Sequence, residues 1–216
     1  MEAAALLKLP FILFLSFIIN GVSASHGFSI VDQPPAVLDS SGNVLLKGEY
    51  YFLDPALILP TIYSAAIIIG IYRNGTCWLQ SEIAIFTYGI TGLPVQFSPV
   101  EPNDDESIHE STDLNIKFSD ELSPLCGGSS VVKVGELEEE YVSLGGVEGD
   151  RSSWFKIEKV LDGGIHSYKL VSSSDSQVGR DIGISTSFGE TNRLAPADEP
   201  LVFQFSPLGD GLSASK

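Results

Sequence analysis

The side chains most often used in catalysis and metal binding are thinly spread along this chain of 216 residues. Its three histidines, His26, His109 and His166, stand in three different segments. No two of them have the spacing that places a histidine pair on one helical face to hold a metal ion. A single histidine in a loop is usually a solvated side chain, so we expect no metal site.

Motifs for phosphate binding and for nucleophilic catalysis are also missing. The stretch GGSS at residues 127–130 lacks the lysine of a phosphate-binding loop, and no Gly-x-Ser-x-Gly sequence occurs. The acidic run at residues 136–140 is more typical of a solvated loop than of a catalytic carboxylate pair. We therefore expect no enzymatic activity and no cofactor.

The most unusual segment is FSPVEPNDDESIHESTDLNIKF, residues 97–118, where an acidic stretch precedes alternating apolar residues. Pro99 and Pro102 restrict the backbone and favour a rigid recognition loop. A segment rich in Asn and Asp is by default a solvated turn, and this alternative stays open.

The whole chain is strongly acidic, with 12 Lys and Arg against 28 Asp and Glu and a formal net charge of −16. Such a surface repels nucleic acid and anionic membranes, and no basic stripe offsets it. We expect neither nucleic acid nor a membrane among its partners.

The N-terminus reads as a targeting segment. Lys8 precedes an apolar run at residues 9–19, and small residues follow up to Ala24. A run of this length is too short to span a bilayer and is typical of a secretory signal peptide, with a signal anchor as the less favoured alternative. We predict a signal peptide at 1–24, a secreted protein, and one domain at 25–216, two small domains being less favoured.

A secreted protein can form disulfides and carry N-linked glycans, and the sequence contains residues for both. Cys77 and Cys126 can pair in an oxidising compartment, although two separate buried thiols are an alternative. Asn74, Gly75 and Thr76 form a sequon for N-glycosylation.

Short apolar segments separated by turn residues follow one another along the rest of the chain. Alternation with a period of two, as in Leu114, Ile116 and Phe118, is the mark of a half-buried strand. We therefore predict an all-β fold with about a dozen strands, the clearest lying at 44–46, 50–53, 78–79, 83–86, 114–118, 131–134, 141–144, 154–157, 168–171 and 201–205.

Two segments need separate interpretation. The stretch AAIIIGIY, residues 65–72, is too short to cross a membrane and is predicted to be a strand covered on both faces. Residues 206–216 are small and polar, and we predict a frayed tail there.

Several stretches together resemble the plant Kunitz (soybean trypsin inhibitor) family, its miraculin-like branch included. The N-terminal signature is matched within VLDSSGNVLLKGEYYFL, residues 37–53, although Ser41 departs from it. Other similar segments follow in the order of the family: NGTC at 74, GLPVQFSP at 92, ESTDLNIKFS at 110, SSVVKVG at 129, WFKIEKV at 154, YKLV at 168, GRDIGI at 179 and RLAPADEPLVFQF at 193.

The resemblance implies a β-trefoil of twelve strands with pseudo-threefold symmetry, in which six strands form a barrel under a hairpin cap. Cys77 and Cys126 match the first of the two disulfides usual in the family. The second is absent, because residues 169–181 contain no cysteine. We expect the loop at 172–177 to be more mobile for that reason.

Family members that inhibit serine proteases use a loop that begins here at Ser98 and Pro99 and ends near Ser111. A trypsin-like pocket needs Lys or Arg at the primary contact, and none occurs between Arg73 and Lys117. Depending on the anchor of the alignment, Glu101 or Asp104 takes that position. We expect no useful inhibition of trypsin, and the resemblance assigns the reactive loop to Pro99, Val100, Glu101, Pro102, Asn103 and Asp104.

Two functions follow as alternatives. The first is a monomeric inhibitor of another endopeptidase, either a serine protease that binds Val100 or Ile108 or a cysteine or aspartic protease that binds another loop. The second is a β-trefoil that has lost inhibition and serves in storage, taste modification or ligand binding. Fold alone does not decide between them.

Overall fold

The computed structural model describes residues 33–56, 63–71, 77–85, 92–102, 104–120, 124, 128–135, 140–173, 179–185 and 192–208. All of these except Gln33 belong to one unit, Pro34–Lys216. Within the described ranges, no helix is long and apolar enough to cross a membrane.

The described part of the chain contains twelve strands and almost no helix. One 3-10 turn, η3 (Arg151–Ser153), precedes β8, and the Asp150 side chain at its start accepts a hydrogen bond from the Ser152 amide. The strands are β1 (Tyr51–Pro55), β2 (Tyr63–Ile71), β3 (Cys77–Ile85), β4 (Val95–Pro99), β5 (Leu114–Phe118), β6 (Val132–Val134), β7 (Val142–Leu144), β8 (Phe155–Lys159), β9 (Tyr168–Ser172), β10 (Arg180–Ser185), β11 (Arg193–Pro196) and β12 (Val202–Pro207).

Six of the strands form a closed ring. The pairing runs in the order β12, β1, β4, β5, β8 and β9, and β9 then pairs with β12 through Tyr168 opposite Phe203. Closure removes the free edges that an open sheet would expose. The ring is therefore the barrel that the family resemblance implied.

Alternate residues of the ring strands point inward and fill the barrel. The Phe97 and Phe205 rings meet edge to face at 5.4 Å, and Phe205 also lies 5.6 Å from Tyr168. The other large side chains of this core are likewise almost inaccessible to solvent: Phe118, Phe155, Ile157, Leu114, Ile116 and Phe203.

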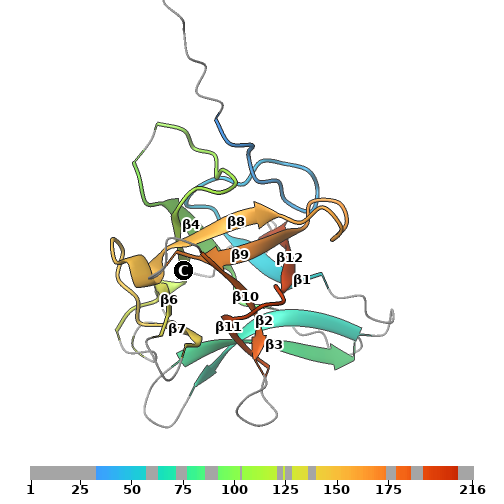
Figure 1. Ribbon diagram of the computed structural model, residues 1–216, viewed down its shortest axis with the longest axis vertical. Coiled ribbons are helices and arrows are strands. Elements are labelled where there is room, and N and C mark those ends of the chain that lie inside the picture. The colour runs from blue at the N-terminus through green and yellow to red at the C-terminus, as the bar shows by residue number, and fades with distance from the viewer. Residues whose placement is uncertain are drawn as a thin grey trace, which may run out of the picture. The chain divides into compact units, whose positions relative to one another are not determined.

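The remaining strands form three antiparallel hairpins, β2–β3, β6–β7 and β10–β11. Trp78 of β3 pairs with Ser143 of β7, and Arg193 of β11 pairs with Gln80 of β3, so the three hairpins join around one centre. Each hairpin follows one ring strand and precedes another, which divides the chain into three similar units of four strands. In Figure 1, β2 and β3 lie below the ring strands β8 and β9. This topology is a β-trefoil, as predicted.

The strand predictions are correct in type but not in every boundary. Residues 78–79 and 83–86 were expected to be separate strands, yet β3 runs without a break through Cys77–Ile85 because it pairs along its length with β2. In β2, Ala66 and Ile67 are buried while Ile68 and Ile69 are only half-buried, so coverage of both faces is incomplete.

The predicted frayed tail was placed too early. Ser206 and Pro207 belong to β12, where Pro207 lies opposite Tyr51, and the Leu208 amide donates to the Tyr50 carbonyl. Pairing with β1 holds this segment in place. Residues 209–216 and the predicted mobile loop from 174 onward lie outside the described residues.

Candidate functional site

The candidate loop rests on a small hairpin near the start of the unit. The buried Asp39 carboxylate accepts hydrogen bonds from the amides of Ser41 and Asn43 at 2.8 and 2.9 Å, which fixes the turn of this hairpin. The isolated β-bridge between Leu38 and Val44 closes it. The predicted strand at 44–46 is therefore limited to isolated bridges.

Two buried tyrosines hold the hairpin against the barrel. The Tyr51 hydroxyl accepts from the Leu46 amide at 2.9 Å, and the Tyr168 hydroxyl accepts from the Leu38 amide at 3.0 Å. Burial raises the pKa of both phenols, opposed in part by these hydrogen bonds. Asp39, Tyr51 and the other residues of the N-terminal signature thus have structural roles beneath the loop.

The candidate loop connects β4 with β5. Its neck is short, because Pro99 lies opposite Leu114 and the Val100 amide donates to the Asp113 carbonyl at 2.9 Å. Beyond the neck, Glu101, Pro102 and Asp104 are exposed, and Asn103 lies outside the described residues. We call residues 101–104 the tip.

The chain after the tip, residues 105–111, is held along its length and is called the arm below. Ile108 is 1 % exposed, and its amide donates to Leu45 while its carbonyl accepts from Val37. The amides of Glu110 and Ser111 donate to Pro35 and Ile157. The arm thus joins three separate parts of the fold through its backbone.

Side chains add to this attachment where the tip meets the arm. Asp105 accepts from the Ser107 amide at 2.9 Å through Oδ1, and its Oδ2 lies 2.7 Å from His109 Nε2. The other ring nitrogen, Nδ1, lies 2.7 Å from the Pro34 carbonyl oxygen. The His109 side chain is 11 % exposed and the Asp105 side chain 36 % exposed, so the contact between them is partly screened from solvent.

A cavity of about 330 Å³ separates the two sides of the loop. Pro99, Val100 and Glu101 line one side, His109 and Asp113 lie on the other, and Trp154 also contributes to the wall. Glu101 thus borders this cavity, and the described residues of the tip are connected to the fold through the neck and the arm.

The charge on the loop is negative and only partly balanced. Lys47 lies 3.4 Å from Glu106, and Lys156 lies 3.9 Å from Asp113. Glu101 and Asp104 make no ion pair with any residue that the structure describes, so the tip presents free carboxylates.

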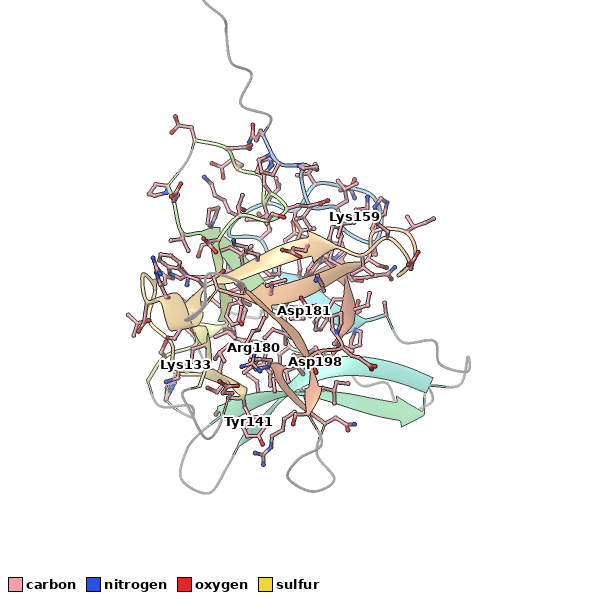
Figure 2. The ribbon with its side chains drawn as sticks, viewed as in Figure 1. Lys133, Tyr141, Lys159, Arg180, Asp181 and Asp198 are labelled. Atoms are coloured by element: carbon pink, nitrogen blue, oxygen red, sulfur yellow. The ribbon has the colours of Figure 1, made fainter. Side chains whose placement is uncertain are left out.

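Two basic residues of other segments are not close to the loop. Lys133 and Arg180 lie apart from it (Figure 2). Arg180 instead pairs with Glu140 at 2.5 Å. Among the described residues, no ion pair neutralises Glu101 or Asp104.

The structure separates the predicted site residues into three groups. Pro99 and Val100 form the neck, Glu101, Pro102 and Asp104 form the exposed tip, and Ile108 is buried. Ile108 was one option for the apolar primary contact, and this option was wrong because its side chain fills the space beneath the arm. The alternation of apolar and polar residues identifies buried positions in strands, but it gave no sign that Ile108, a loop residue, belongs to the core.

His109 and Asp105 were not recognised as a pair from the sequence. His109 was interpreted as a solvated side chain, yet it contacts both the arm and the segment before the hairpin. Their separation by four residues inside an acidic loop is a weak signal. The pair can be identified only in the structure, where the backbone places Pro34 next to His109.

The predicted disulfide and the predicted glycan each involve a residue that the structure does not describe. Cys77 is 1 % exposed, whereas Cys126 and Asn74 lie outside the described residues, so the disulfide and the glycan stay predictions. Among the described residues, no group of three His, Cys, Asp or Glu side chains is placed to hold a metal ion.

Comparison with known proteins gives one consistent result. The legume Kunitz family, described as "Trypsin and protease inhibitor", matches residues 37–206. Kunitz trypsin inhibitor 3 of Arabidopsis thaliana is 28% identical over 197 residues, covering 86% of this chain and 84% of that protein.

Solved structures agree with this result. The trypsin inhibitor from soybean matches with a TM-score of 0.62 and 26% identity, and the match covers 81% of this chain and 100% of that chain. A structure of type II water soluble Chl binding proteins has a TM-score of 0.65 and 26% identity, covering 81% of this chain and 99% of that one. With its trefoil topology and a family match across most of its length, this chain belongs to the plant Kunitz family of trypsin and protease inhibitors.

Proposed function

We propose that this protein is an endopeptidase inhibitor that binds its target through Val100 and the tip at residues 101–104 and does not act on trypsin. The observation that carries the proposal is an exposed tip between a hydrogen-bonded neck and a firmly attached arm. Family members are inhibitors rather than enzymes, which agrees with the absence of a catalytic motif in the sequence.

Preorganisation is the physical basis of such inhibition. A loop that is already held in its bound shape loses little conformational entropy when a protease binds it. The arm is attached to Leu45, Val37, Pro35 and Ile157, so a cut within the tip would leave the new ends close together. Rejoining or retention of the cut ends would keep the protease occupied.

The charge of the tip supports a target other than trypsin. The pocket of a trypsin-like enzyme carries a buried aspartate, and a carboxylate from Glu101 or Asp104 would meet it without a counter-ion. With Ile108 buried, the remaining primary contacts are Val100 for an apolar pocket and Glu101 or Asp104 for a pocket that accepts an acidic residue.

The same proposal includes export and processing. Residues 1–24 act as a signal peptide, residues 25–216 form one secreted, monomeric domain, Cys77 pairs with Cys126, and Asn74 carries a glycan. Expression of the full chain in a eukaryotic secretory host tests these points together. Mass spectrometry before and after reduction and deglycosylation is expected to find Ser25 at the N-terminus, one disulfide and one glycan.

The inhibitory function is tested by residual activity of trypsin, chymotrypsin, subtilisin, papain, pepsin and a glutamyl endopeptidase in the presence of the secreted protein. The expected result is no nanomolar inhibition of trypsin and tight inhibition of at least one other enzyme. No inhibition of any enzyme in the panel would contradict the inhibitory function. Nanomolar inhibition of trypsin would contradict the proposed specificity.

A second candidate is a non-inhibitory trefoil that binds a small ligand or serves in storage. Two observations favour it: the tip lacks Lys and Arg, and a protein named for chlorophyll binding shares the fold at 26% identity. Saturable binding of a chlorophyll, together with no inhibition of any protease in the panel, would support this candidate.

A further inference from the structure

We propose that Asp105 and His109 are positioning residues that set the junction between the tip and the arm and keep the loop an inhibitor rather than a substrate. This inference rests on the proposed function. It concerns a contact that lies behind the tip, and neither residue needs to touch the protease.

The geometry ties three segments together at one point. Asp105 is the first residue after the tip, and both of its carboxylate oxygens are engaged, Oδ1 by the Ser107 amide at 2.9 Å and Oδ2 by His109 Nε2 at 2.7 Å. His109 in turn reaches the Pro34 carbonyl at 2.7 Å through Nδ1. The end of the tip is thereby linked to the segment that precedes the first hairpin.

The position of His109 is itself determined by the backbone. Ala36 and His109 form an isolated antiparallel β-bridge, and the Thr112 hydroxyl donates to the His109 carbonyl at 2.8 Å. With the backbone held on both sides and the ring largely buried, the imidazole has one orientation toward Asp105. A protonated ring donates to both oxygens, and a neutral ring donates to one of them.

The inner side of the loop is hollow beside this contact. The cavity between the neck and the arm leaves the tip without packing from below, and Glu101 lines that cavity. The backbone bonds of the arm start at Glu106, whose carbonyl accepts from the Lys47 amide at 2.9 Å. Asp105 is therefore the last fixed point before the exposed residues.

Release of this junction would change the outcome of cleavage. If the chain behind the tip is free to move after a cut, the new N-terminus leaves the enzyme and the loop is hydrolysed like a substrate. If it stays fixed, the two ends remain in place. The pair accordingly affects the rate of net cleavage more than the stability of the whole domain, because the arm keeps its backbone bonds.

The experiment uses the full chain, secreted from a eukaryotic host, with glutamyl endopeptidase as the probe because this enzyme cuts after acidic residues such as those of the tip. Cleavage within residues 101–105 is followed by mass spectrometry for the wild type, His109→Ala, Asp105→Ala and the double variant. Asp105→Asn keeps the shape of the side chain without its charge. His166→Ala is the matched control, since His166 is a half-buried histidine on another loop, with no described partner for its Nδ1.

We expect each single variant to be cut at the tip roughly tenfold faster or more, as loss of a charge-assisted hydrogen bond would give. The double variant should be no faster than the faster single variant, because both changes break one contact. Asp105→Asn should lie between the wild type and Asp105→Ala, and His166→Ala should match the wild type.

Wild-type rates for the single variants, or fully additive rates in the double variant, would overturn the proposal. Thermal unfolding of each variant guards against a general loss of fold, and acceleration that merely follows a fall in Tm at every cleavage site would also overturn it. The measurement needs no inhibition by the wild type. Failure of the proposed function in the protease panel is therefore distinguishable from failure of the positioning pair.

Discussion

Reversing the charge of the tip should convert the protein into a trypsin inhibitor. Asp104 is exposed, directly precedes the arm and makes no ion pair with a described residue, so its replacement breaks no ion pair within the described fold. In Asp104→Arg, a guanidinium takes the place of a carboxylate opposite the aspartate of the trypsin pocket.

The size of the effect follows from the two charges. At a separation of about 4 Å and an effective dielectric constant of about 20, two unit charges interact by about 4 kcal/mol. The change from repulsion to attraction therefore has an upper limit of about 8 kcal/mol. Solvent and the ordering of the arginine side chain offset about half of it. The remaining ~4 kcal/mol corresponds to an inhibition constant about a thousandfold lower.

The assay is a titration of trypsin with the wild type, Asp104→Arg, Glu101→Arg and a control. Asp198→Arg changes the net charge equally at an exposed position between β11 and β12, which lies apart from the loop (Figure 2). If Glu101→Arg inhibits trypsin more tightly and Asp104→Arg does not, the primary contact is residue 101 and not residue 104. If neither variant inhibits trypsin better than the control, the loop is not the segment that the protease recognises.

Three further predictions concern the scaffold. Tyr168→Phe removes the acceptor of the Leu38 amide and should lower the free energy of unfolding by about 1–3 kcal/mol in urea titrations, whereas the same substitution at the half-buried Tyr50 should have little effect. Ile108→Ala leaves a cavity beneath the arm and should cost about 2–5 kcal/mol by the same method, and an unchanged midpoint would show that the arm is not packed. Burial raises the pKa of Asp54 above its ordinary value of 3.8, so the folded state holds a proton more tightly than the unfolded state and ionisation costs stability at neutral pH. Asp54→Asn should therefore raise Tm at pH 7 and leave it unchanged at pH 3, and an equal shift at both pH values would contradict this explanation.

The barrel could be predicted from the sequence because its strands obey one simple rule. A strand with one face in the core alternates apolar and polar residues, as Leu114, Ile116 and Phe118 do. The N-terminal signature was recognised through its resemblance to the family, and in the structure Asp39 and Tyr51 make local turn and hydroxyl contacts. Short-range patterns are enough for features of this kind.

The loop could be located but not described. Its acidic composition gave no sign that residues 105–111 would be attached while residues 101–104 stay exposed. That division depends on backbone bonds to Val37, Leu45 and Ile157, which are distant in sequence. The burial of Ile108 and the contact between His109 and Pro34 arise from the same long-range arrangement, so no local pattern predicts them.

The position of the bond that an inhibited protease cuts would identify the segment of this protein that binds the enzyme. The secreted protein is incubated for long periods with a catalytic amount of the enzyme that it inhibits best, and the new termini are identified by mass spectrometry. We expect one slow cut between Val100 and Asp105, with both fragments still associated under native conditions. A cut in any other loop, or rapid release of the fragments, would contradict it.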